Sequence, residues 1–338
     1  MPNLLALDAG GTSTRAVLLT PSGQCLGYGT AGGGNPVSRG LSPALQALSA
    51  ASRQALGGRV EPLGQVLVAM AGASVEMPLE LLHDSFAAFG LSGKVLIESD
   101  LLATFYSGTF HDSGHALIAG TGAVGARVAQ GRLFSVADGM GWLLGDAGSG
   151  FWLGREVAQA VGAALDGRGP ATALTAPLLA ELGIAAEGQA DHIQGRLRAQ
   201  QQLITKVYER SAIELSRFAP LVFAASGDRV AQGIIDRAGA ALAQTLLATA
   251  ASSPKGDMDA VTAIMSGPLI FGGSVLTKGV SVAAAVTGRL RARDGTVARP
   301  VLVADGAVGA AVMALKRSGI DVDAKVFARI QHSLALLR

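Results

Sequence analysis

Short apolar runs alternate with segments of helical periodicity through the first third of the chain. Leu4–Leu7 and Arg15–Thr20 flank a glycine-rich turn, and a second turn leads to a further strand over Gln24–Thr30. Apolar residues spaced as on one helical face then fill Leu41–Leu56. The same criteria predict a strand, a helix and a strand over Val66–Met70, Leu79–Phe89 and Val95–Ile97. This part is therefore expected to be a mixed α/β unit.

The same plan begins again near residue 114. Ala116–Ala119 is an apolar run, Gly120-Thr121-Gly122 is a turn, and Val124–Ala129 alternates as a strand does. Gln130-Gly131 predicts a hairpin turn before the next strand, Leu133–Val136. The recurrence predicts two domains with related cores, one over residues 1–113 and one over residues 114–338.

The rest of the second domain is mostly helical in its pattern. Trp152–Ala251 is expected to form helices, interrupted by a loop at Ala185–Gln189. Leu269–Phe271 and Val301–Val303 are late strands, each followed by a helix. A final helix, Ala324–Leu337, is placed so that it can pack back on the first domain.

Composition supports a folded chain with close approaches of backbone to ligand. The 338 residues exceed one typical domain of roughly 100–200 residues. Apolar residues make up 49% and charged residues 15%, which argues against intrinsic disorder. Glycine is abundant, with 46 residues clustered beside small polar ones, as in turns that a ligand approaches closely.

Charge and cysteine content exclude several classes of function. The net charge of +2 and the lack of any Lys/Arg run argue against a nucleic-acid partner. Cys25 is the single cysteine, which excludes disulfides within the chain and cysteine-based metal sites. The N-terminus lacks a basic signal region, and the charge-free stretch at 238–254 contains polar residues. A cytoplasmic protein with no membrane span is expected.

The segment from Asp8 to Thr14 follows the first strand directly. Gly10 and Gly11 let backbone N–H groups approach phosphate oxygens, and the hydroxyls of Thr12 and Thr14 add donors. Asp8 is expected to orient Mg²⁺ through water. The alternative is an ordinary tight turn that the carboxylate caps.

Two later turns are also candidates for binding the phosphates of a nucleotide. Gly120-Thr121-Gly122 begins a formal G-x-G-x-x-G match, but a hairpin follows it where a dinucleotide site requires a helix. A second phosphate-binding turn is therefore predicted. Gly272-Gly273-Ser274 lies between a strand and a helix, a suitable place for the α-phosphate and ribose of a nucleotide.

Three polar segments are candidates for binding a hydroxyl-bearing ligand and for activating one of its hydroxyls. Asp100, at the end of a strand, is placed to accept a proton from an attacking hydroxyl, although this segment taken alone favours a helix N-cap at Ser99 or Asp100. Residues 138–150 contain five glycines and two carboxylates, of which Asp146 is suited to bind a polyol. Asn35 ends a glycine-rich loop, which is either a sugar contact or a surface loop.

In this order, the segments resemble the N-acetylglucosamine kinase family and the wider ATPase group that includes benzoyl-CoA reductase subunits. The specific match is Gly-Trp-Leu-Leu-Gly-Asp at 141–146, followed by Gly-Ser-Gly-Phe-Trp. The resemblance implies two ribonuclease-H-like domains of the actin/hexokinase type with ATP and Mg²⁺ in a central cleft. It implies Asp100 as the base, Asn35, Gly139 and Asp146 as sugar contacts, Ser74 as a contact at the hinge, and a homodimer.

Three positions depart from the family pattern. Ala147 replaces a usual Glu, and Trp142 and Asp138 replace a His and a Gly of the animal enzymes. We expect Asp138 to contact an unacetylated amine, which would favour glucosamine. The related iron–sulfur activators are excluded because they need cysteines that this chain lacks.

The function expected from the sequence is ATP-dependent phosphorylation of an amino sugar, N-acetylglucosamine or glucosamine, at the C6 hydroxyl. An ATPase coupled to a partner protein is the first alternative. A sugar-sensing module without catalysis is the second, and a nicotinamide oxidoreductase is disfavoured by the hairpin after Gly120.

Overall fold

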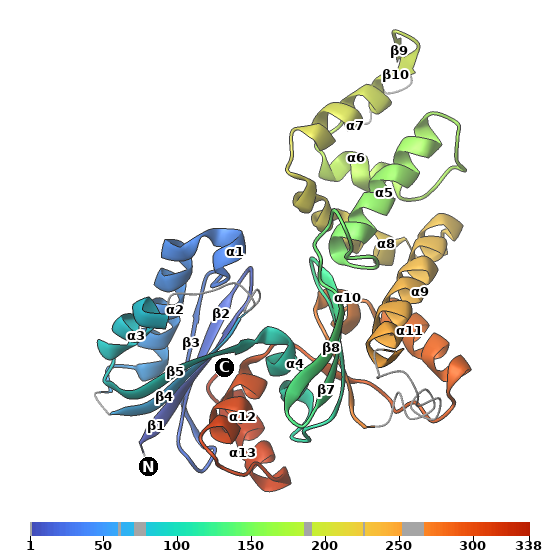
Figure 1. Ribbon diagram of the computed structural model, residues 1–338. Helices are drawn as coiled ribbons and strands as arrows, with labels where there is room; N and C mark the ends of the chain where they lie inside the picture. The colour runs from blue at the N-terminus through green and yellow to red at the C-terminus, as the bar shows by residue number, and fades with distance from the viewer. Residues whose placement is uncertain (1, 60–61, 71–78, 186–190, 226, 252–266) are drawn as a thin grey trace. The chain divides into compact units, whose positions relative to one another are not determined.

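A computed structural model describes residues 2–59, 62–70, 79–185, 191–225, 227–251 and 267–338 (Figure 1). The chain forms two compact units. The first comprises Met1–Ala116, Val128–Phe134 and Val303–Arg338, and the second comprises Leu117–Arg127 and Ser135–Leu302. The sequence assigned everything after residue 113 to the second domain, whereas residues 303–338 lie in the first unit. A buried hydrogen bond of 3.1 Å from Gln65 Nε2 to the carbonyl of Ala314 helps to hold this C-terminal segment in the first unit.

The first sheet has five strands in the order β3-β2-β1-β4-β5. Their bounds are β1 Asn3–Ala9, β2 Thr14–Leu19, β3 Cys25–Ala31, β4 Leu63–Met70 and β5 Leu91–Ser99. β1 runs antiparallel to β2, with Leu5 opposite Leu18, and parallel to β4, with Leu5 opposite Val66. This central strand is buried along most of its length, as its unbroken apolar run predicts.

Helices cover this sheet. They are α1 Pro36–Arg39, α2 Leu41–Leu56, α3 Leu79–Ala87, α4 Asp100–Gly108, α12 Ala307–Arg317 and α13 Ala324–Ala335. α2 packs on β2 and β3, and α12 packs on β1, β4 and α4. Ala44, Leu48, Ala51 and Ala55 form the buried face of α2, which ends at Gly57 in the left-handed conformation.

The second sheet repeats the plan of the first, in the order β12-β11-β6-β7-β8. Its strands are β6 Gly114–Ala119, β7 Ala123–Ala129, β8 Arg132–Asp138, β11 Leu269–Gly272 and β12 Val301–Val303. Gln130 and Gly131 have φ values of 50° and 70°, as a two-residue hairpin turn of type I′ requires. In both sheets the third, second, first, fourth and fifth strands lie side by side, which confirms the predicted α/β repeat.

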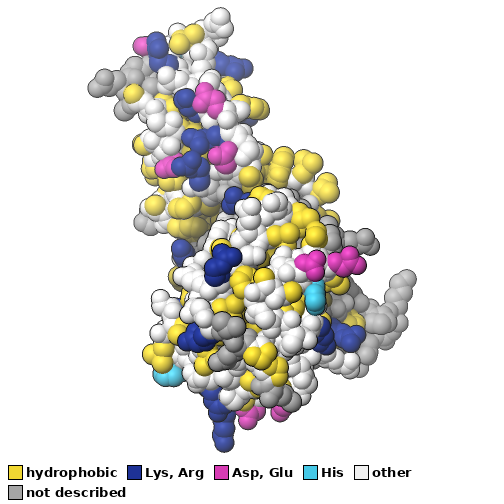
Figure 2. Space-filling view, turned by 90° about the vertical axis from the view of Figure 1, so that its left-hand side faces the viewer, with side chains coloured by type: hydrophobic (Ala, Val, Ile, Leu, Met, Phe, Trp, Pro, Cys, Tyr) yellow, Lys and Arg dark blue, Asp and Glu magenta, His cyan; other side chains and the backbone are white. Residues whose placement is uncertain are grey.

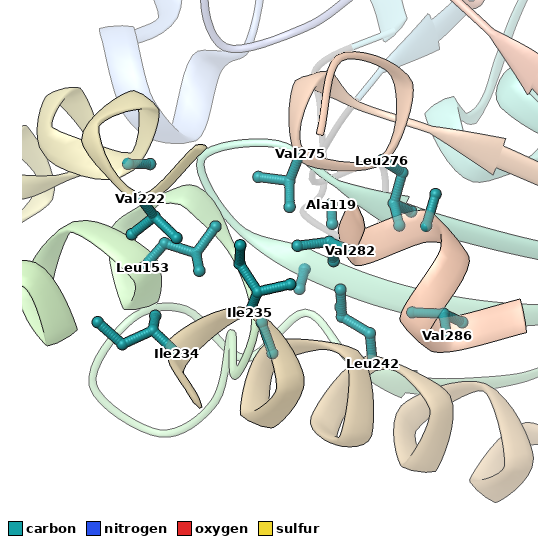
Figure 3. Packing of buried hydrophobic residues seen from close by; sticks show 14 of the residues in the cluster. Ala119, Leu153, Val222, Ile234, Ile235, Leu242, Val275, Leu276, Val282 and Val286 are labelled. Carbon is teal, nitrogen blue, oxygen red and sulfur yellow. The ribbon is translucent and has the colours of Figure 1, made fainter. Parts of the chain in front are cut away.

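The second unit is largely helical outside its sheet. Its helices are α5 Gly150–Leu165, α6 Thr175–Glu181, α7 Arg198–Tyr208, η1 Ala212–Phe218, α8 Ala219–Ala224, α9 Arg229–Ala251, α10 Ser274–Thr277 and α11 Val280–Arg293. A short hairpin, β9 His192–Ile193 and β10 Arg196–Leu197, was not predicted, and most of the expected loop at 185–189 lies outside the described residues. Side chains of α5, α9, α10 and α11 converge on Ala119 at the end of β6 (Figure 3). This core fixes the end of β6, where the predicted phosphate turn begins.

Basic and acidic side chains are interspersed on the face drawn in Figure 2. Within the described part of the chain, no helix combines the length and the apolar character that a membrane crossing needs.

Candidate active site

Asp8 lies near the end of β1 with its side chain almost fully buried. Gly306 donates its backbone N–H to Asp8 Oδ2 at 2.9 Å. Arg15, which pairs with Asp8 across β1 and β2, places its Nη1 3.5 Å from the same oxygen. The carboxylate is therefore held by one backbone donor and one guanidinium, both from the first unit.

Asp305 is a carboxylate at this site that the sequence did not single out. Its Oδ2 lies 3.4 Å from Arg15 Nε, and its Oδ1 lies 2.7 Å from Arg338 Nη2. Arg338 also lies over the ring of Tyr28, 5.4 Å from its centroid. Asp305 follows β12 just before α12, the same strand-end position that drew attention to Asp8 and Asp100, so this signal was present in the sequence.

The three carboxylates concentrate negative charge. Burial raises the pKa of Asp8 to about 6, against the opposing effects of Arg15 and of the Gly306 N–H, and Asp305 and Asp100 raise it further. Burial also raises the pKa of Asp100, which begins α4. Ser99 Oγ accepts the N–H of Leu101 at 3.2 Å and caps this helix. Asp100 is therefore not needed as the N-cap.

The oxygen donors of this site fit a hard cation such as Mg²⁺. The raised pKa of Asp8 reflects buried negative charge that a cation would compensate. In the described residues, no three side chains are placed to ligate one metal ion directly. A cation beside Asp8 would therefore take most of its ligands from water and phosphate.

The loop at 32–35 packs against the Asp8–Thr14 segment. Thr14 Oγ1 donates to the carbonyl of Gly32 at 2.8 Å, and Gly34 donates its N–H to the carbonyl of Gly10 at 3.0 Å. Thr14 is fully buried, so its hydroxyl proton serves this contact, whereas the sequence predicted a phosphate donor. Thr12 is exposed. Asn35 is the last residue of this loop and directly precedes α1.

In the second unit, the Gly120–Gly122 turn is bound by the start of α5. Gly150 donates its N–H to the carbonyl of Gly120 at 2.7 Å, and Phe151 donates to the carbonyl of Thr121 at 3.1 Å. Ser149 caps α5 by accepting the N–H of Trp152. The carbonyls of the turn therefore point into the protein and are satisfied there.

Asp138 and Asp146 lie at the two ends of the loop between β8 and α5. Asp146 Oδ1 accepts the N–H of Ala123 at 2.9 Å, and Asp138 Oδ1 accepts the N–H of Asp146 at 2.8 Å. Burial raises the pKa of Asp146, and the charge of Asp138 raises it further. Gly139 donates its N–H to the carbonyl of Ala123 at 3.0 Å. The loop between them exposes Met140, Trp142, Leu143 and Leu144.

A cavity of about 370 Å³ opens beside Gly120 and Thr121. Pro220, Phe223 and Val275 give it apolar walls, and Ser274, from the predicted nucleotide turn at 272–274, lines it as well. Lys278 supplies positive charge at this cavity, and Arg217, whose Nη2 lies 3.1 Å from Glu181 Oε1, lines it as well. Sequence reasoning missed both residues, because isolated cations carry no local signal.

The predicted residues thus form two groups, one in each unit. Asp8, Asp100, Asn35 and the Gly10–Thr14 loop belong to the first unit. Asp138, Gly139, Asp146 and the turns at 120–122 and 272–274 belong to the second unit. Ser74 lies outside the described residues. Each group combines a glycine-rich turn with carboxylates.

Known proteins share this architecture. A sequence model of the BadF/BadG/BcrA/BcrD ATPase family matches residues 5–314. The N-acetyl-D-glucosamine kinase of Dictyostelium discoideum is 28% identical over 256 residues, which cover 70% of this chain and 76% of that protein. The N-acetylmuramic acid/N-acetylglucosamine kinase of Clostridium acetobutylicum is 25% identical over 247 residues, with the same coverage of both chains.

A solved structure from Chromobacterium violaceum, provisionally assigned as an N-acetylglucosamine kinase, superposes with a TM-score of 0.65. Its sequence is 24% identical, and the match covers 93% of this chain and 99% of that one. This likeness shows that the two chains share a fold.

Proposed function

The chain belongs to the BadF/BadG/BcrA/BcrD ATPase family, and we propose that it is an ATP-dependent kinase of an amino sugar, N-acetylglucosamine or glucosamine. The observation that carries this proposal is the cavity beside the Gly120-Thr121 turn, with apolar walls for a base and with Lys278 and the Glu181-paired Arg217 beside it for phosphates. The kinases of similar sequence from Dictyostelium discoideum and Clostridium acetobutylicum support the choice of acceptor.

In the proposed reaction the γ-phosphoryl group passes in line to the C6 hydroxyl of the sugar. Such transfer depends mainly on positioning and on stabilising charge. Backbone N–H groups of residues 11–12 and 121–122 would hold the phosphates, since Gly10 and Gly120 donate theirs to the carbonyls of Ser13 and Gly122. Asn35 and Asp146 would orient the sugar. Mg²⁺ supplies charge neutralisation at the phosphate oxygens when it is bound, and Asp8 would orient it through water.

Asp100 is the proposed base. Its carboxylate lies at the start of α4, half-buried and close enough to Asp8 to raise the pKa of that residue. The carboxylate would accept the hydroxyl proton as the bond to phosphorus forms. Burial raises the pKa of Asp100. At a pH above this pKa the carboxylate is ionised, and it then accepts a proton more readily than an exposed aspartate does.

The decisive experiment measures ADP release from Mg·ATP with a panel of hexoses and amino sugars and with no sugar. Turnover that appears only with one or two amino sugars is expected. A 6-deoxy analogue of the best substrate should be inert, because it lacks the acceptor oxygen. Steady turnover without sugar would instead indicate an ATPase coupled to a partner, and sugar binding without turnover would indicate a sensing module.

We further propose a homodimer that acts on a small-molecule sugar in the cytoplasm. Light scattering at several protein concentrations tests the assembly, and a monomer at all of them would exclude the dimer.

A further inference from the structure

Both ends of the loop at residues 138–146, here called the sugar loop, bind one residue beside the phosphate turn at 120–122. Gly139 donates its N–H to the carbonyl of Ala123, and Ala123 donates its own N–H to Asp146 Oδ1. Asp146 in turn donates its N–H to Asp138 Oδ1. These three hydrogen bonds, of 3.0, 2.9 and 2.8 Å, close a ring through the two ends of the loop and Ala123.

The backbone at both carboxylates is in a region that most side chains avoid. Asp138 has a φ of 64° and Asp146 a φ of 61°. Residues other than glycine rarely adopt this left-handed conformation, and asparagine and aspartate tolerate it best. Such conformations persist only where the surrounding contacts hold them. In this loop, the hydrogen bonds of the ring are those contacts.

The phosphate turn leaves no room for Asp146 to move towards it. A Cβ atom added to Gly122 would lie 2.9 Å from Asp146 Oδ1, so the carboxylate packs directly against the backbone of the turn. Asp146 is 5% exposed, and Asp138 Oδ1 is the acceptor that fixes its backbone N–H. The position of Asp146, and with it the N–H of Ala123, therefore depends on Asp138.

We propose that Asp138 is a positioning residue whose carboxylate fixes Asp146 and, through Asp146, the phosphate turn. This inference rests on the proposed kinase function. It differs from the expectation that Asp138 contacts a free amine, because a positioning role affects acetylated and unacetylated sugars alike. It also predicts that loss of the Asp138 carboxylate weakens the binding of ATP as well as that of the sugar.

Two substitutions separate the hydrogen bond from the backbone conformation. Asp138→Asn keeps an oxygen acceptor and tolerates a positive φ, so kcat should stay within about threefold of wild type. Asp138→Gly removes the acceptor without backbone strain, and we expect kcat to fall about tenfold and KM for ATP to rise. N-acetylglucosamine and glucosamine should be affected by the same factor. A loss confined to glucosamine in both variants would overturn the positioning role.

Hydrogen exchange tests the ring without any turnover. In Asp138→Gly, the amide of Ala123 should exchange about tenfold faster or more, together with that of Asp146, because the opened ring exposes both. Asp166→Gly is the matched control, since Asp166 Oδ1 also accepts a backbone N–H, from Arg168, in the same unit. Unchanged exchange at Ala123 in Asp138→Gly would overturn the proposal. If the wild-type protein shows no sugar-dependent turnover, the proposed kinase function is wrong. The exchange rates at Ala123 and Asp146 then still test whether Asp138 positions Asp146.

Discussion

Burial of Asp8 beside Asp305 and Asp100 disfavours its ionised form in the folded protein. Burial raises the pKa of this carboxyl from 3.8 to about 6. The folded state therefore binds the proton more tightly than the unfolded chain, and the free energy of unfolding falls as the pH rises from about 4 to about 6. The shift corresponds to about 3 kcal/mol of lost stability at neutral pH.

Asp8→Asn should remove this pH dependence. We expect the variant to gain stability relative to wild type between pH 4 and pH 7, by up to about 3 kcal/mol, while it loses Mg·ATP-dependent turnover. Denaturant unfolding of both proteins across this pH range measures the difference. Asp84→Asn, at an exposed position of α3, is the control. If the free energies of unfolding of Asp8→Asn and wild type change with pH in parallel, the buried charge of Asp8 does not cause the loss of stability between pH 4 and pH 6.

Asp100→Asn tests the proposed base. The substitution preserves size and removes the proton acceptor, so kcat should fall by about 10²–10⁴ with a modest change in KM for the sugar. The Asp84→Asn variant should keep wild-type kinetics. Near-full kcat in Asp100→Asn, measured as ADP release under saturating sugar, would remove Asp100 from the role of base.

The sequence identified the carboxylates at the ends of β1 and β5, because a polar residue that ends a buried apolar run stands out from its neighbours. It did not identify their partners. Gly306 is separated from Asp8 by 298 positions, and Arg338 from Asp305 by 33, so no local pattern links them. The role of Thr14 was missed for a related reason, since its acceptor, Gly32, lies 18 residues away across a strand pair.

At the scale of elements, α4 and α12 approach closely at one glycine. A Cβ on Gly309 of α12 would lie 1.8 Å from the carbonyl oxygen of Ala103 in α4, while Gly309 donates its N–H to Ser107 Oγ at 2.9 Å. The start of α4 carries Asp100. The position of the proposed base therefore depends on how closely these helices pack.

Gly309→Ala should force α4 and α12 apart. We expect a loss of about 1–3 kcal/mol in the free energy of unfolding, as overpacking usually costs, together with a lower kcat. Gly288→Ala in α11 is the matched control, because nothing lies within 4 Å of its added Cβ. That variant should be neutral or stabilised by up to about 1 kcal/mol. Equal effects of the two substitutions on thermal unfolding would refute the packing argument.

Elements with strong local signals were predicted well. α2 begins and ends where its apolar spacing predicts, and the hairpin after Gly120 forms at Gln130-Gly131. The hairpin at 192–197 was missed because its two-residue strands are too short to show alternation. The hydrogen bonds of the sugar loop also escaped prediction, since they depend on left-handed aspartates whose conformation the sequence does not reveal.

At the scale of the whole molecule, the proposed reaction needs groups from both units. We predict that the cognate sugar draws the units together, because closure excludes water and limits wasteful ATP hydrolysis. Small-angle X-ray scattering should then give a smaller radius of gyration with the sugar than without it. A sugar that fails to support turnover serves as the control, and an equal change with both sugars would argue against specific closure.

The return of residues 303–338 to the first unit has a consequence for synthesis on the ribosome. At about 5–20 residues per second, Gly306 follows Asp8 out of the ribosome after roughly 15–60 s. During this delay β1 lacks the cover of α12, and the core of the second unit receives its last residue, Val297, only shortly before Gly306 emerges. The nascent first sheet should therefore be a client for chaperones, and a chain that stalls before α12 cannot assemble the surroundings of Asp8.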